Sequence, residues 1–234
     1  HGRDGVTFNC LAPGVVDTDI QSPGIHVLFG LGEDEMGLCL NDYLWGKCTI
    51  TAAAHDVTAR LGAPVTGKVL LVPSSIKAVE IARVLREGYD VGLLNDGFND
   101  LIRELHLDVL LVDTHPGMNE ETLLSISISD VLIIILRPDH QDYQGTAVTV
   151  DVARKLEVPQ MLLLVNRVPA VFNSADVKAR VESAYDCEVA AVLPHSDELM
   201  ALASSGLFAL CQTENPVTLG LQQLASRLRA GIPV

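Results

Sequence analysis

Five short, continuous apolar runs constrain the fold of this chain more than any other feature. They are separated by amphipathic segments, and they cover residues 69–72, 109–112, 131–136, 161–165 and 189–193. Strands that are covered on both faces carry apolar residues without alternation, so such runs are typical of a parallel sheet between layers of helices. The sequence therefore predicts an α/β protein built from strand–helix–strand units with right-handed crossovers.

Amphipathic patterns predict the helices, over residues 76–88, 143–157, 174–185 and 216–230. In the second of these, Val148, Val152 and Leu156 recur every four residues, and we expect them to form the buried face. Asn173 and Asn215 precede two of the helices and are residues that cap helix N-termini. No linker, repeat or low-complexity stretch interrupts the pattern, so we expect one three-layer α/β/α domain.

The charge balance argues against broad binding to nucleic acid. The chain has 30 Asp and Glu against 16 Lys and Arg, a net charge of −14, and such binding depends on many basic side chains. The five cysteines form no C-x-x-C pair, which fits a reducing compartment. No apolar run reaches about 18 residues, and the last predicted helix has only Arg227 and Arg229 as cations. We expect a cytoplasmic protein with no clear membrane anchor.

The stretch GAPVTGKV, residues 62–69, matches most of the phosphate-loop pattern G-x-x-x-x-G-K-S/T. A phosphate loop follows a strand and begins a helix, whose N-terminus points at the phosphates. Here Lys68 leads into an apolar run that is predicted to be a strand, and Pro64 lacks an N–H. Val69 stands where a hydroxyl would bind Mg²⁺. We therefore interpret this stretch as a turn before a strand.

Two other stretches end an apolar run in a carboxylate and then turn. One is Val15 to Gln21, with Asp17 and Asp19, and the other is Leu110 to Gly117, with Asp113. Ligands of open α/β sheets bind outside the carboxyl ends of the strands. Acidic residues there can hold Mg²⁺ and position an attacking water. Each residue taken alone is equally typical of a turn or a helix cap.

Four motifs in order along the chain resemble the MinD/ParA family of ATPases, which are P-loop proteins with a deviant Walker A motif. D-x-D-x-Q at 17–21 resembles the family's switch I. LLVDTHPG at 110–117 resembles its Walker B strand and switch II, usually D-T-P-P-G or D-T-A-P-G, so His115 is a departure. LLVNR at 163–167 and VLPHSD at 192–197 resemble the adenine-recognition strand and the loop over the base. The resemblance implies a P-loop NTPase-like fold with a mostly parallel, doubly wound sheet.

The resemblance also implies ATP or ADP with Mg²⁺ as cofactors, slow ATP hydrolysis, and a homodimer that forms on ATP binding and positions an unknown protein partner. Asp113 would hold Mg²⁺ through water, with Asp17 nearby on the same ion. Asp19 would orient the hydrolytic water, and Gly117 would offer an N–H to the γ-phosphate. The remaining nucleotide contacts, at the base, would come from Asn166, Arg167 and Pro194.

The family's lysine-containing phosphate loop should stand before Val15, but residues 1–14 contain no lysine. We divide the chain into an atypical segment, 1–14, with room for one strand over 6–11, and an ATPase domain, 15–234. A missing central strand would leave the backbone groups of its neighbours exposed. Three explanations remain open. The chain is a nucleotide-free interaction module that has lost the loop, its true N-terminus has been replaced, or the loop is present in the actual molecule and missing from this sequence.

Overall fold

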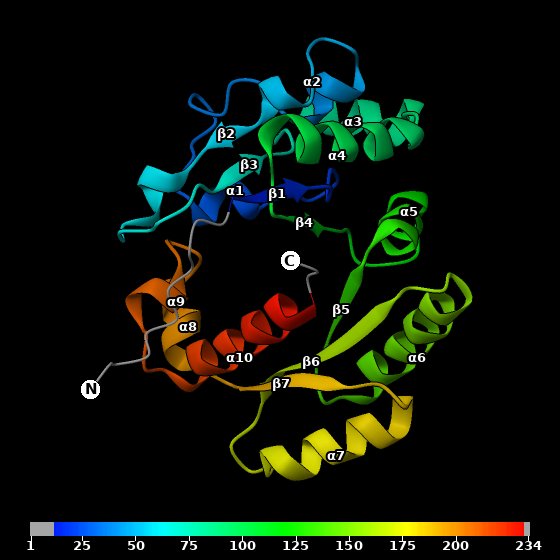
Figure 1. Ribbon diagram of the computed structural model, residues 1–234, viewed down its shortest axis with the longest axis vertical. Coiled ribbons are helices and arrows are strands. Elements are labelled where there is room, and N and C mark those ends of the chain that lie inside the picture. Colours follow the sequence, from blue (N-terminus) through cyan, green and yellow to red (C-terminus); the bar gives the residue numbers. More distant parts are fainter. Residues whose placement is uncertain (1–11, 232–234) are drawn as a thin grey trace. The chain divides into compact units, whose positions relative to one another are not determined.

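All five predicted apolar runs form strands in the computed structural model, which describes residues 12–231 (Figure 1). The predicted strand over 6–11, and most of the predicted segment 1–14, lie outside these residues. The strands are β1 (Pro13–Asp17), β2 (His55–Asp56), β3 (Leu70–Val72), β4 (Val109–Asp113), β5 (Val131–Leu136), β6 (Gln160–Val168) and β7 (Val189–Pro194). Since β1 begins at Pro13, it crosses the boundary that we placed between residues 14 and 15.

The chain divides into two compact units. The first ends at Leu124 and includes Ser204–Leu207, and the second comprises Ser125–Ala203 and the residues from Phe208 onward. The boundary after Leu124 falls inside helix α5 (Glu120–Ile128), where the sequence has no linker composition.

The first unit contains a four-stranded sheet in the order β2-β3-β1-β4. β1 is parallel to both β3 and β4, and β2 is antiparallel to β3. One face, with Val16 and Val72, packs against the helices α2 (Leu40–Leu44), α3 (Ala78–Glu87) and α4 (Gly92–Leu105). The other face, with Leu71, packs against α1 (Ile25–Leu28) and the 3₁₀ helix η2 (Thr58–Leu61). A second 3₁₀ helix, η1, covers Thr51–Ala53.

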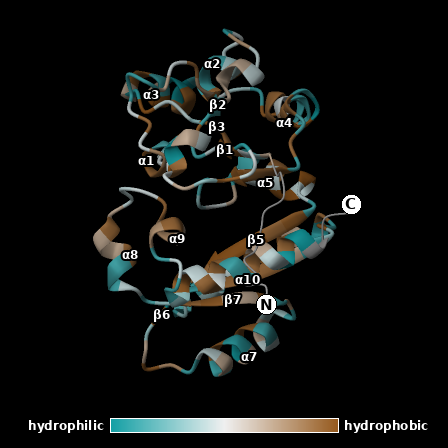
Figure 2. Ribbon diagram, turned by 60° about the vertical axis from the view of Figure 1, so that its left-hand side comes forward, coloured by the Kyte–Doolittle hydropathy of each residue, from teal (hydrophilic) through white to brown (hydrophobic). Residues whose placement is uncertain are grey.

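The second unit contains three parallel strands in the order β5-β6-β7, drawn in the colour of apolar residues in Figure 2. Side chains from α6 (His140–Lys155) and α7 (Ser174–Tyr185) cover one face. Side chains from α9 (Phe208–Cys211) and α10 (Pro216–Gly231) cover the other, and α8 (Asp197–Leu202) follows β7. The predicted α/β class, with mostly parallel strands between layers of helices, is confirmed.

The predicted helix starts at residues 174 and 216 are confirmed, those at 76 and 143 differ by two and three residues from the observed Ala78 and His140, and one predicted buried face is wrong. Asn173 Oδ1 accepts hydrogen bonds from two backbone N–H groups at the start of α7, as a helix cap does. In α6, Val148 is 56% exposed, and the buried residues are Thr146, Val150 and Ala153. The helix thus turns this face to the sheet, whereas the apolar spacing alone favoured the neighbouring face.

Each sheet has two edge strands within the described residues, β2 and β4 in the first unit and β5 and β7 in the second. β4 pairs only with β1, and β5 pairs only with β6, so each has one row of backbone groups without a neighbouring strand. Both carry an exposed apolar residue, Leu111 at 44% and Ile135 at 62%. Within residues 12–231, no helix is long and apolar enough to cross a membrane.

Candidate functional site

The predicted acidic residues of the first unit lie together at the carboxyl ends of two strands of its sheet. β1 and β4 run parallel and end at the same level, where Asp17 and Asp113 are register partners. The first residue after β1 already connects the two chain segments. Both the N–H and the hydroxyl group of Thr18 donate to the carbonyl oxygen of Asp113, at 2.9 and 2.6 Å. The two acidic motifs therefore form one cluster, as the sequence predicted.

Asp17 is fully buried and serves the loop that follows β1. Its Oδ1 accepts from the N–H of Asp19 and its Oδ2 from the N–H of Gly24, both at 3.2 Å. Burial and the nearby charge of Asp113 raise the pKa of Asp17 to about 6, against the lowering effect of these N–H donors. Since both oxygens already accept hydrogen bonds, Asp17 shapes the loop directly.

Asp113 is the open carboxylate of the cluster. The residue is exposed at the end of β4, and its side chain has no hydrogen-bonding partner among residues 12–231. Partial desolvation of the carboxyl group, and then the charge of Asp19, raise its pKa. Asp113 is therefore the residue of this cluster that is best placed to hold a cation.

His115 was noted in the sequence only as a departure from the family pattern, yet it contacts the third acidic residue. Its Nδ1 lies 2.8 Å from Oδ1 of Asp19. The backbone carbonyl of His115 accepts from the hydroxyl group of Thr122 at 3.2 Å. Sequence spacing could not predict the first contact, because it joins two loops 96 residues apart.

A second contact that sequence reasoning missed fixes the end of β1. Ser74, which follows β3 and is fully buried, donates its hydroxyl group to the carbonyl oxygen of Asp17 at 2.6 Å. The cluster is thus held from both neighbouring strands of β1. The only sequence signal was a pair of serines directly after an apolar run.

No group of three or more His, Cys, Asp or Glu side chains that could hold a metal ion occurs in the part of the chain that the structure describes. Mg²⁺ does not require such a group, because in nucleotide sites it binds one or two carboxylates together with water and phosphate oxygens. The partnerless carboxylate of Asp113 fits that coordination. Asp17 fits it through water, because its side chain is buried and each of its oxygens already accepts one hydrogen bond.

Gly117 lies in the loop after β4 and has a φ of +121°. Side chains rarely adopt this backbone conformation, so glycine is the natural residue there. No atom lies within 4 Å of the place that a Cβ would occupy. The backbone around Gly117 is therefore open to an approaching group.

The other three candidate residues lie in the second unit and are close to one another. Asn166 and Arg167 lie in a bulge near the end of β6. The register of the pairing between β6 and β7 shifts there, between Val165 and Val168, and Val168 pairs with Pro194. Arg167 has a φ of +57°, and its N–H donates to Oδ1 of Asn166 at 2.8 Å. The Asn166 amide group keeps its NH₂ for another acceptor.

The stretch GAPVTGKV has the structure that we predicted from its sequence. It connects η2 to β3, and no helix follows it before that strand. Gly62 ends η2 with a φ of +68°, and Lys68 is exposed. This stretch therefore lacks the helix N-terminus on which a phosphate loop depends.

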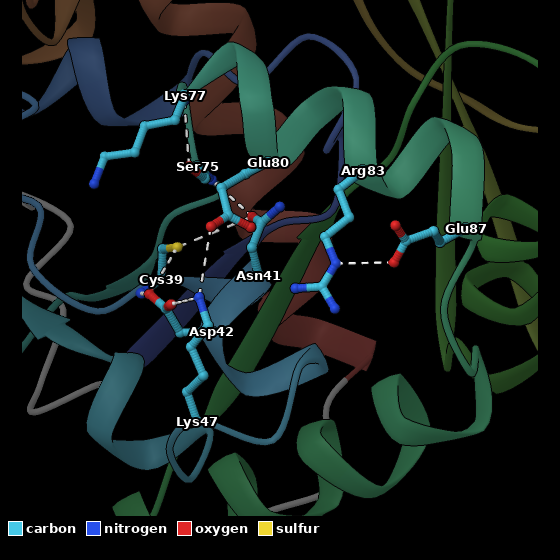
Figure 3. Close-up of polar contacts among 9 residues, drawn as sticks. All are labelled: Cys39, Asn41, Asp42, Lys47, Ser75, Lys77, Glu80, Arg83 and Glu87. Atoms are coloured by element: carbon cyan, nitrogen blue, oxygen red, sulfur yellow. Dashed lines mark hydrogen bonds and ion pairs between the residues drawn. The ribbon is translucent and has the colours of Figure 1, made fainter.

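A second group of polar side chains lies where α2 and α3 meet the end of β3 (Figure 3). Lys47 Nζ lies 2.9 Å from Oδ1 of Asp42 and 3.5 Å from Oε1 of Glu80. Asn41, which is fully buried, accepts from the N–H of Ser75 at 2.8 Å. These contacts join three segments of the first unit, and Asp42, Ser75 and Glu80 line one small pocket there.

Cys39 lies in the same group, but it is not a reactive thiol. Burial and then the Asp42 carboxylate, to which Sγ donates at 3.2 Å, raise the pKa of Cys39 to about 11. A thiol with this pKa is protonated at neutral pH and is a poor nucleophile. The group in Figure 3 therefore holds helices in place.

Several solved structures share the fold of this chain. A ParA family ATPase from Chlorobium tepidum matches with a TM-score of 0.70 and 15% identity over 92% of this chain and 86% of its own. The septum site-determining protein MinD from Pyrococcus horikoshii, in complex with Mg-ADP, matches with a TM-score of 0.72 and 15% identity, over 92% and 82%. The chain has a MinD/ParA-like fold. The predicted three-layer, mostly parallel fold class is thereby confirmed.

The same MinD/ParA-like fold also occurs in a biosynthetic enzyme. Cobyrinic acid a,c-diamide synthase from Mycobacterium smegmatis, with bound ATP analog and magnesium, matches with a TM-score of 0.68 and 18% identity, over 93% and 82%. A protein of Methanocaldococcus jannaschii described as an uncharacterized ATP-binding protein is 23% identical over 217 residues, which is 92% of this chain and 75% of that protein. No protein-family model matches the sequence.

Proposed function

We propose that this chain is a MinD/ParA-like molecular switch that binds ATP with Mg²⁺, hydrolyses it slowly, dimerises with nucleotide and positions a protein partner. The observation that carries the proposal is the cluster of Asp17, Asp19 and Asp113 at the carboxyl ends of two adjacent parallel strands. Ligands of open α/β sheets bind at this edge. The Mg-ADP and ATP-analog complexes of proteins with the same fold support a nucleotide as the ligand.

Each residue has a role that its geometry allows. Asp113, with a free carboxylate, would hold Mg²⁺, which would neutralise phosphate charge when bound. Asp17 would keep the loop in shape and accept from a water on the ion. Asp19 would orient the attacking water through Oδ2, which has no partner among the described residues. The N–H of Gly117 would donate to the γ-phosphate.

The base would be recognised in the second unit. The NH₂ group of Asn166 would donate to the adenine edge, and Arg167 and Pro194 would contact the ring. The bulge in β6 supports this assignment, because irregular pairing aims side chains away from the ladder.

One observation favours a second candidate function, a nucleotide-free interaction module. The sequence contains no Gly-Lys-Ser or Gly-Lys-Thr, so it offers no phosphate loop of the usual type. Without the loop's N–H groups and lysine, the phosphates would lose much of their stabilisation. The two functions differ in whether this chain binds ATP.

Calorimetric titration of the full chain with ATP, and separately with ADP, both with Mg²⁺, distinguishes the two functions. We expect binding that Asp113→Ala weakens at least tenfold and that Asp130→Ala leaves unchanged. Asp130 is a suitable control because it is also exposed but precedes β5, at the opposite end of a strand. Bound ATP should also raise the temperature of thermal unfolding, because ATP at 100 times its Kd adds about 2.7 kcal/mol to the free energy of unfolding.

Sedimentation of the same chain with and without ATP tests the nucleotide-dependent dimer. Failure of both nucleotides to bind, in calorimetry and in thermal unfolding, would favour the interaction module. If Asp113→Ala and Asp130→Ala affect nucleotide binding equally, the acidic cluster is not part of the nucleotide site.

A further inference from the structure

His115 and Asp19 form a specific contact between two loops. The 2.8 Å contact between Nδ1 and Oδ1 joins side chains that are 28% and 14% exposed, so it is partly shielded from water. The same Oδ1 accepts from the N–H of Ser22 at 3.0 Å. Oδ2 of Asp19 has no partner among residues 12–231. The carboxylate is therefore held by one oxygen and free at the other.

We propose that His115 is a positioning residue for Asp19. Its Nδ1–H fixes the plane of the carboxylate and directs Oδ2 away from the loop, toward the water that Asp19 would orient. The role of that water rests on the proposed function, whereas the arrangement of the two side chains does not.

The chemistry of the pair fixes the state of the imidazole ring. An ionised carboxylate only accepts hydrogen bonds, so Nδ1 carries the proton in this contact. In the neutral ring Nε2 then carries none. The structure thus assigns the Nδ1-protonated tautomer to His115, although free imidazole side chains carry the proton on either nitrogen.

The contact also joins the loop after β1 to the loop after β4. His115 is anchored on its own side, because Thr122 donates to its carbonyl oxygen. Thr18 anchors the other side through its two hydrogen bonds to Asp113. A proline or alanine at position 115, as in the motif that this chain resembles, could not donate to Asp19. The contact is therefore a property of this chain's own sequence.

Two substitutions distinguish a hydrogen bond from Nδ1 of His115 from simple packing of its side chain. His115→Asn places an amide nitrogen near the position of Nδ1, whereas His115→Gln places it near Nε2. We expect the Asn variant to keep the contact and the Gln variant to lose it, with His115→Ala as the full deletion. All three change a partly exposed loop residue of the full chain.

The first measurement needs no nucleotide. Long-range ¹H–¹⁵N spectra at about pH 8, where an ordinary imidazole is neutral, should show the Nδ1-protonated tautomer for His115. Amide exchange of Ser22 should accelerate about tenfold in the Gln and Ala variants and stay near the wild-type rate in the Asn variant. An Nε2-protonated ring, or equal exchange in all four proteins, would overturn the proposal.

The second measurement uses ATP with Mg²⁺. If the chain hydrolyses ATP, kcat should fall about tenfold in the Gln and Ala variants with KM unchanged, and the Asn variant should restore it. Equal kcat in Gln and Asn variants would contradict positioning by Nδ1. If the chain binds no ATP, the proposed function fails, and the spectra and exchange rates still decide whether His115 holds Asp19.

Discussion

Asp17 and Asp113 are register partners on two parallel strands, and the charge of Asp113 adds to burial in raising the pKa of Asp17. Two carboxylates are thus held near each other in an environment that disfavours charge. Sites that bind cations often have this property, because the ion supplies the missing compensation. The same property predicts how the stability of the protein depends on pH.

The native state should lose stability relative to an Asp17→Asn variant as the pH rises from about 4 to about 6. The pKa of Asp17 rises from 3.8 to about 6 on folding, so folding favours its protonated form. This contribution is fully present below 3.8 and is lost as the pH passes 6. The loss amounts to at most about 3 kcal/mol.

Urea unfolding at pH 4, 5, 6 and 7 without divalent cations measures this difference. Asp130→Asn, an exposed carboxylate, should follow the wild-type curve at a constant offset. Parallel curves for Asp17→Asn and the wild type would show that Asp17 titrates normally.

Two glycines in helices should respond to alanine in opposite directions. A Cβ on Gly97 in α4 would lie 2.9 Å from Cε1 of Tyr43, whose hydroxyl group donates to the carbonyl of Leu93 and so holds the ring. We expect Gly97→Ala to lower the free energy of unfolding by about 1 kcal/mol or more. Gly145 in α6 has no atom within 4 Å of such a Cβ, so Gly145→Ala should raise it by about 0.5–1 kcal/mol.

Urea unfolding of both variants at constant pH checks the pair. Stabilisation by Gly97→Ala would mean that the Tyr43 ring moves freely, in spite of its hydrogen bond.

The only tryptophan of the chain should report the loss of Arg83. The guanidinium carbon of Arg83 lies 3.7 Å from the centroid of the Trp45 ring. Arg83→Ala should cost about 0.5–1 kcal/mol and change the fluorescence of the folded protein. Arg86→Ala is the matched control, because Arg86 pairs with Glu87 as Arg83 does but has no aromatic ring contact. An identical spectrum in the Arg83 variant would contradict the stacking.

A charge on the open edge of β5 should reduce aggregation. Ile135 is 62% exposed on a strand with one free side among the described residues, which is a typical site of edge-to-edge association. Ile135→Lys should therefore lower concentration-dependent light scattering after mild heating. Val171→Lys adds the same charge to an 86% exposed loop residue and should have a smaller effect. An equal effect of both substitutions would point to net charge instead of the edge.

The parallel strands and the acidic cluster were predictable from the sequence, because continuous apolar runs imply parallel strands and parallel strands end at a common edge, whereas the short antiparallel strand β2 has no apolar run and was not predicted. Asp17 and Asp113 met there for that reason. The contact of His115 with Asp19 was not predictable, because loop geometry sets it and spacing does not. The buried face of α6 was predicted wrongly at Val148, since two faces of that helix carry apolar residues and only packing selects one.

Gly117 lets the loop after β4 turn in a way that any other residue would resist. Residues with a Cβ rarely adopt its φ of +121°, although no atom lies within 4 Å of the place that the Cβ would occupy. A substitution there would therefore strain the backbone and not the packing, and its cost would come from the direction in which the loop presents its N–H groups.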